Sequence, residues 1–206
     1  MTAASILQKK ESVVTPESLI YEIMDGQPIY YRGYKNVLNQ TKTIEEIMGC
    51  STLRFAIINY LLRLLYSNID DSDYLIANNE AGVHLDEKNN LSADIALFDW
   101  TVLTPQKVNK KYADVPPKYV IEVDISGEFD VQKSSFLPSD YVHIKMQKLL
   151  DFGVEKVIWI FSESQKITIA EPNKDWITKD WHQEIELFEG IKMNIGEYLQ
   201  QKGITV

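Results

Sequence analysis

The sequence contains a single cysteine among its 206 residues, and histidine is nearly as scarce, with three. Cys50 has no second cysteine for an internal disulfide and no cysteine neighbours that would complete a zinc cluster. Apolar residues are 45% of the chain, but the longest apolar stretch, around residues 55–65, is interrupted by Asn59 and Arg63. The N-terminal residues lack the apolar core and cleavage site of a signal peptide. We therefore expect a cytoplasmic protein, without a membrane segment, in a reducing compartment.

Positive charge is also in deficit, since 21 lysine and arginine residues face 30 aspartate and glutamate residues, for a net charge of −9. A broad basic face for non-specific nucleic-acid binding is thereby disfavoured. Four lysines, Lys107, Lys110, Lys111 and Lys118, could supply a local positive rim, but taken alone this cluster favours a solvated loop. The chain has no glycine-rich phosphate loop, Gly-X-Ser-X-Gly elbow or zinc-ligand spacing, which argues against kinases, serine hydrolases and zinc enzymes.

The pattern along the chain predicts a flexible N-terminal arm over residues 1–14 and a single domain over residues 15–206. Asp25-Gly26 between two strand-like runs predicts a β-hairpin. Apolar residues at helical spacing predict a helix over residues 43–68, in two pieces around Gly49, with Ser51 or Thr52 as N-cap. A second helix is predicted over residues 139–152, ended by Gly153.

Short strands are predicted over residues 74–77, 82–85, 93–98, 119–125 and 155–161, and a C-terminal series follows over residues 166–170, 176–178 and 184–188. A short helix over residues 195–201 closes the chain. This order predicts an α/β fold, in which helices flank a mixed β-sheet with an N-terminal β-hairpin and a C-terminal strand extension.

Two of the predicted strands carry acids among apolar residues. Side chains two apart share a strand face, so Glu122 and Asp124 are expected on one face, with Tyr119, Ile121, Val123 and Ile125 on the other. The same alternation directs Asp94 away from Ala93, Ile95 and Leu97. If the two strands are neighbours, the three carboxylates converge and repel, by roughly 4 kcal/mol per pair at an effective dielectric near 20. A divalent cation such as Mg²⁺ would remove that repulsion and activate water for attack on a phosphodiester.

Lys145 falls within the apolar arc of the second predicted helix. Its ammonium group is positioned either to orient water and stabilise negative charge at a scissile phosphate, or only to pair with an acid while its stem packs. This helix alone leaves the two interpretations equally open. Glu22 and Glu80 are weaker candidates that could approach the same site.

The ordered segments ADIALF, PPKYVIEVD and KMQKLLDFGVEKVIWIF resemble the Uma-type family of restriction endonucleases, within the PD-(D/E)XK nuclease superfamily. The resemblance runs from about Tyr21 to the C-terminus and implies a restriction-endonuclease-like fold. It places Asp94, Glu122 and Lys145 at the catalytic positions. One departure matters, because Asp124 stands where the superfamily's Glu-X-Lys motif has its lysine.

The resemblance implies an Mg²⁺- or Mn²⁺-dependent endonuclease acting on DNA. Its metal ligands would be Asp94 and Glu122, with Asp124 as an additional one. A homodimer is expected, since two symmetric sites most simply cut both strands of a duplex. The alternative is a catalytically inactive nuclease-fold module that binds nucleic acid or protein, which Asp124 and the net charge favour.

Overall fold

The computed structural model describes residues 16–125, 127–128 and 140–206, so the predicted arm over residues 1–14 lies outside the described residues. The described part forms a nine-stranded mixed sheet and a separate two-stranded hairpin. The large sheet contains β1 (Ile20–Met24), β2 (Gln27–Tyr31), β3 (Tyr74–Asp86), β4 (Asn89–Asp99), β5 (Tyr119–Val123), β6 (Gly127–Glu128), β7 (Lys156–Phe161), β8 (Lys166–Ala170) and β9 (Ile177–Asp180). The hairpin contains β10 (Ile185–Phe188) and β11 (Ile191–Met193).

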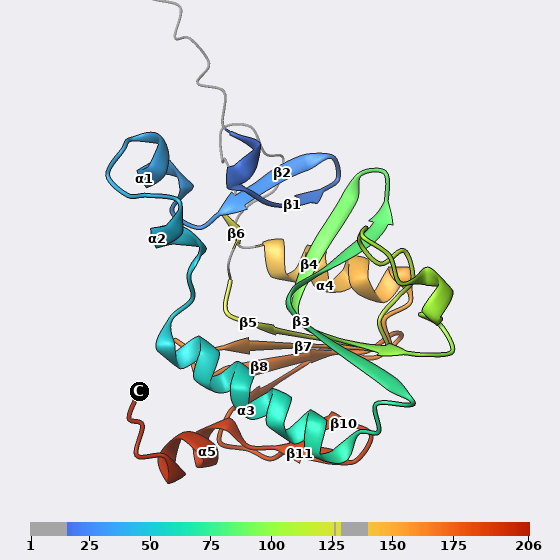
Figure 1. The fold of residues 1–206 in the computed structure, drawn as a ribbon. Coiled ribbons are helices and arrows are strands. Elements are labelled where there is room, and N and C mark those ends of the chain that lie inside the picture. The colour runs from blue at the N-terminus through green and yellow to red at the C-terminus, as the bar shows by residue number, and fades with distance from the viewer. Residues whose placement is uncertain (1–15, 126, 129–139) are drawn as a thin grey trace, which may run out of the picture.

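Helices lie on both faces of the sheet, as Figure 1 shows. They are α1 (Tyr34–Leu38), α2 (Glu45–Met48), α3 (Thr52–Asn68), α4 (Tyr141–Phe152) and α5 (Ile195–Gln201). One core lies between the sheet and α3, α5 and the β10–β11 hairpin. The other lies between the sheet and α4. The predicted α/β fold, a mixed sheet with flanking helices, is confirmed.

The sequence signals for the first hairpin and the two long helices are also confirmed. Asp25 and Gly26 both have positive φ, as the two-residue turn between β1 and β2 requires. The first helical segment is broken around Gly49 into α2 and α3, and the Ser51 side chain caps α3 by accepting a hydrogen bond from the Arg54 N–H. Gly153 ends α4 in the left-handed conformation at φ 116°.

The strands β5 and β7 are parallel neighbours joined through α4, and the other paired strands of the described sheet are antiparallel. A parallel pair needs a crossover connection, and α4 supplies it while covering one face of the sheet. This unit carries Glu122 on β5 and Lys145 on α4 towards each other.

The sheet forks at β4. One edge of β4 pairs with β3 over most of its length, while the other pairs with β5 through Ile95 to Leu97 and with β1 at Asn90. Residues 91–94 lie between these two pairings, so their backbone faces a gap between β1 and β5. The acidic residue Asp94 is at this fork.

The predicted strands over residues 74–77 and 82–85 are one strand, β3, with an irregularity between Asn78 and Ala81. At this bulge two residues of β3, Asn79 and Glu80, lie opposite the single residue Asp94 of β4. The alternation of β4 changes phase there, since Leu91 and Ala93 join the α4-side core together with Ala96 and Phe98. The prediction that Ala93 faces the same way as Ile95 and Leu97 is therefore wrong, because it assumed an uninterrupted ladder.

None of the described helices combines the length and the hydropathy needed to cross a membrane.

Replacement of a side chain at the α3–sheet interface should destabilise the fold. Leu61 is fully buried in the α3-side core, so Leu61→Ala is expected to lower the free energy of unfolding by about 2–5 kcal/mol. Asn59→Ala, at an exposed position of the same helix, should change it by less than about 0.5 kcal/mol. Denaturant titration measures both, and equal losses would contradict this packing.

Candidate functional site

Three carboxylates from three strands meet at the fork. Asp94 comes from β4, Glu122 from β5 and Glu22 from β1, and all three side chains are buried. Two of them bind backbone N–H groups near the fork. Glu22 Oε2 accepts from the Ser92 N–H at 3.2 Å, and Asp94 Oδ2 accepts from the Val123 N–H at 2.8 Å. The acids therefore satisfy backbone donors where the strands diverge.

Lys145 crosses from α4 to the same place and is 0% exposed. Its Nζ lies 2.9 Å from Glu122 Oε1 and 3.1 Å from Glu22 Oε2. Tyr141, one helical turn earlier, donates its hydroxyl hydrogen to the other oxygen of Glu22. The rings of Tyr21, Tyr141 and Trp159 surround the ammonium group at 5.6 to 5.8 Å. The sequence could not tell whether Lys145 pairs with an acid, and here it pairs with two.

The electrostatics of this cluster follow from its burial. The pKa of Glu122 is raised to about 8, chiefly by desolvation; Lys145 opposes this rise and the nearby charge of Asp94 adds to it. Desolvation lowers the pKa of Lys145, but the two glutamates outweigh it and the net pKa lies well above the ordinary value. The two glutamates thus favour the charged form of Lys145, whereas burial disfavours the ionised form of Glu122.

Asp94 is 6% exposed and is held from two sides. The Val123 N–H binds Oδ2, while Nη2 of Arg54 lies 2.6 Å from Oδ1. Arg54 is in the first turn of α3, whose start is fixed by the Ser51 cap. The position of the guanidinium group therefore depends on the helix start that the sequence predicts.

Asp124 does not continue the strand. It adopts φ 61°, and its two oxygens accept hydrogen bonds from the backbone N–H and the hydroxyl of Ser162. β5 ends at Val123, and Ile125 packs with the α4-side core rather than with Ile121 and Val123. The prediction of one regular strand face through Asp124 is wrong, because a left-handed residue breaks the alternation. Its role as a metal ligand stays a prediction.

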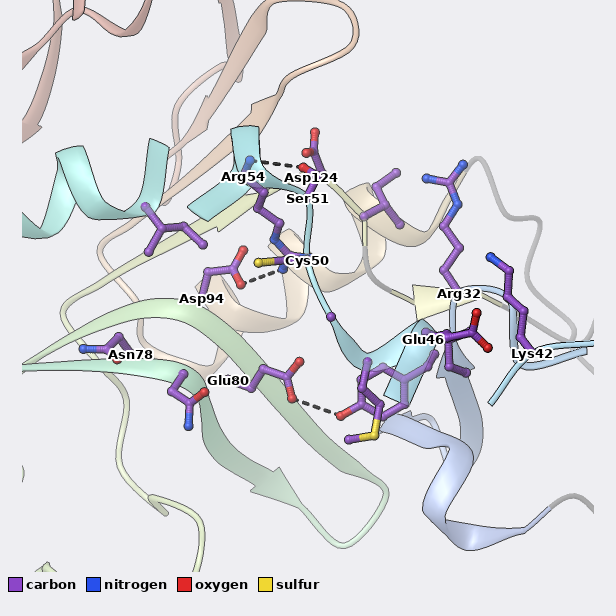
Figure 2. A pocket seen from close by; sticks show the side chains of 18 residues that line it. Arg32, Lys42, Glu46, Cys50, Ser51, Arg54, Asn78, Glu80, Asp94 and Asp124 are labelled. Atoms are coloured by element: carbon purple, nitrogen blue, oxygen red, sulfur yellow. Dashed lines mark hydrogen bonds and ion pairs between the residues drawn. The ribbon is translucent and has the colours of Figure 1, made fainter. Parts of the chain in front are cut away.

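A cavity of about 680 Å³ opens beside Asp94, and Figure 2 shows the side chains that line it. Asp94 and Arg54 lie on one side of this view, with Arg32 and Lys42 on the other. The β3 bulge contributes Glu80, whose carboxylate accepts a hydrogen bond from the Tyr31 hydroxyl at 3.0 Å. The cavity lining thus combines three cationic side chains with four carboxylates, those of Glu46, Glu80, Asp94 and Asp124. The lysines considered for a positive rim, Lys107, Lys110, Lys111 and Lys118, are not among its lining residues.

Sequence reasoning ranked one site residue too low and missed two. Glu22 was a weak candidate, although it lies three residues before the hairpin turn on a strand that the Asp-Gly signal locates. Tyr141 and Arg54 carried no signal, because a tyrosine in an apolar helix arc and an arginine in a helix's first turn are common. Only the fold brings them to the acids.

Whether these residues suit a divalent metal depends on their number and chemistry. Within the described ranges, no three His, Cys, Asp or Glu side chains are grouped to hold a metal ion. Asp94 and Glu122 are close enough for the charge of one to raise the pKa of the other. Mg²⁺ commonly uses only one or two carboxylates, together with waters and phosphate oxygens. Two carboxylates are thus a donor set that Mg²⁺ accepts, and a bound ion at Asp94 and Glu122 stays a prediction.

The comparisons with known proteins support the fold. No protein-family model matches the chain, and no curated protein matches it. Its structure is similar to that of a protein from Anabaena variabilis ATCC 29413 described as a "putative nuclease belonging to DUF820". The TM-score is 0.60 at 12% sequence identity, covering 87% of this chain and 89% of the other. At that identity the likeness shows a shared fold.

Removal of the buried ammonium group should be costly. Lys145→Met leaves Glu22 and Glu122 buried without their cation, and we expect the free energy of unfolding to fall by about 3–5 kcal/mol. Lys148→Met, on the same helix, removes only a partly exposed ion pair with Asp25 and should cost about 0–1 kcal/mol. Adding Glu122→Gln to Lys145→Met should recover part of the loss. Denaturant titration tests the series, and a Lys145→Met variant as stable as Lys148→Met would contradict the network.

Proposed function

We propose that the protein is a metal-dependent endonuclease that hydrolyses phosphodiester bonds of DNA, of the Uma-type within the PD-(D/E)XK superfamily. The observation that carries the proposal is the contact of Lys145 with Glu122. Glu122 lies on β5 and Asp94 on the neighbouring strand β4, so the three residues of the sequence motifs come from adjoining elements. The nuclease-like fold supports it independently.

In this proposal Asp94 and Glu122 hold an Mg²⁺ or Mn²⁺ ion, with Asp124 as a possible third ligand after a change of side-chain partner. When bound, the ion would lower the pKa of a coordinated water and offset the charge of the scissile phosphate. Substrate would enter through the cavity next to Asp94, where Arg32 and Lys42 offer positive charge to flanking phosphates.

Lys145 has a narrower role than the sequence motif implies. Because its ammonium group is enclosed by two glutamates and three aromatic rings, it fixes the carboxylate of Glu122 in the metal-free arrangement. We therefore assign it as a positioning residue for Glu122. Glu22 and Tyr141 in turn hold Lys145, so the support for Glu122 reaches back to β1.

Nuclease assays on supercoiled plasmid test the proposal. The pure protein should nick or linearise DNA with Mg²⁺ or Mn²⁺ and lose this activity with EDTA. Asp94→Asn and Glu122→Gln should each lower the rate by about 100-fold or more, the scale of a single group that stabilises developing charge. Glu184→Gln, in an exposed ion pair with Lys192, is the charge-matched control and should cleave like wild type.

Two results would contradict the nuclease assignment. One is wild-type protein that cleaves neither duplex nor single-stranded DNA with either metal. The other is a Glu122→Gln variant that folds and cleaves as fast as wild type. Binding of a labelled oligonucleotide without cleavage would instead support the inactive nucleic-acid-binding module. Sedimentation measurements test the expected homodimer.

A further inference from the structure

Arg54 contacts the carboxylate oxygen of Asp94 that has no backbone donor. Asp94 Oδ2 is bound by the Val123 backbone, which leaves Oδ1 as the oxygen without a backbone donor. Arg54 Nη2 lies 2.6 Å from that oxygen, the short distance of a charge-assisted hydrogen bond. The proposed ligand Asp94 is thus already engaged by a cation of the chain itself.

The second proposed ligand, Glu122, also acts electrostatically on the guanidinium group. The charge of Glu122 acts on Arg54 together with that of Asp94, so both carboxylates contribute to its environment. The Arg54 side chain is only 14% exposed, and it lines the cavity from which an ion or a substrate would approach. Arg54 therefore contacts Asp94 at a place where both side chains line the cavity, as Figure 2 shows.

A positive charge beside Asp94 reduces the repulsion between the buried carboxylates. Two carboxylates buried side by side repel each other, and Lys145 offsets Glu122 and Glu22 but does not contact Asp94 in any described interaction. A cation at Oδ1 lets Asp94 stay ionised in the protein without metal. A divalent ion would supply the same compensation with twice the charge.

We propose that Arg54 is a resident cation that stands in for the metal ion at Asp94, so that a divalent ion binds by displacing it. This inference rests on the proposed function, because it takes Asp94 and Glu122 as the metal ligands. It adds that Arg54 sets the metal affinity of the site by competing for Asp94. The Arg54 side chain is then a determinant of the metal concentration at which the site fills.

Titration calorimetry with Mn²⁺ on EDTA-treated, full-length protein tests the competition without any assay of cleavage. Arg54→Gln removes the guanidinium charge but keeps the backbone N–H that Ser51 caps. We expect it to bind Mn²⁺ about ten- to a hundredfold more tightly than wild type, the worth of one charge-assisted hydrogen bond. Metal-free Arg54→Gln should also melt at a lower temperature, and Mn²⁺ should raise its Tm more than that of wild type.

Arg32→Gln is the matched control, because it removes the same charge from the same cavity at a residue with no described contact to Asp94. Its Mn²⁺ affinity should stay within about threefold of wild type. Arg54→Lys, which keeps a positive charge without the planar fork, should fall between wild type and Arg54→Gln and serves if Arg54→Gln does not fold.

The outcomes separate this inference from the proposed function. If wild type cleaves DNA with metal but Arg54→Gln and Arg54→Lys bind Mn²⁺ no more tightly, Arg54 does not compete and the inference is wrong. Equal gains in Arg32→Gln and Arg54→Gln would also overturn it, since they would reflect long-range charge. If neither wild type nor any variant binds Mn²⁺, the site is not a metal site, and both the proposed function and this inference are wrong.

Discussion

Lys145 carries a positive charge into the interior, and the chain surrounds that charge with two carboxylates and three aromatic rings. A buried ammonium group is tolerated only where its lost hydration is replaced by ionic and hydrogen-bonding partners. Glu122 arrives from β5 and Glu22 from β1, so the requirement links α4 to two strands that do not pair with each other. At the fork in the sheet, β1 and β5 come close enough for Glu22 and Glu122 to contact the same ammonium group.

Backbone irregularities gather around this fork. The β1–β2 register shifts between Ile20 and Glu22, the β3 bulge places Asn79 and Glu80 in left-handed conformations opposite Asp94, and Asp124 leaves β5 in the same conformation. Such residues cost roughly 1–3 kcal/mol each unless the surroundings compensate, and bulges redirect side chains next to functional sites. Here the compensation is visible, since Asp124 binds Ser162 and Glu80 binds Tyr31. The left-handed residues thus occur where the strands diverge at the fork, an arrangement that a regular sheet would not allow.

This clustering explains how far the sequence could predict the structure. Patterns with a local cause were read correctly, including the turn at Asp25-Gly26, the helix break at Gly49 and the end of α4 at Gly153. The family resemblance grouped Glu122 with Lys145, and the two side chains are in contact, whereas helix periodicity alone left the partner of Lys145 open. The failures concern Asp124, Ala93 and the division of β3, where alternation was assumed to continue through residues that the fork makes irregular. Arg54 could not be found, because its contact with Asp94 joins residues 40 positions apart and has no local signature.

The charges at the fork explain why the site is suited to a further cation. Glu22, Asp94 and Glu122 bring three negative charges, against two positive charges from Arg54 and Lys145. One negative charge therefore remains when all five groups are ionised, and burial, the main cause of the raised pKa of Glu122, makes that charge unfavourable. Under the proposed exchange a divalent ion replaces the single charge of Arg54, and the cluster becomes neutral with every carboxylate ionised. Lys145 cannot make this exchange, since it is enclosed and held by two acids, whereas Arg54 borders the cavity. Under this proposal the two cations have different roles: Lys145 maintains the geometry of the fork, and Arg54 holds a position that a metal ion would take.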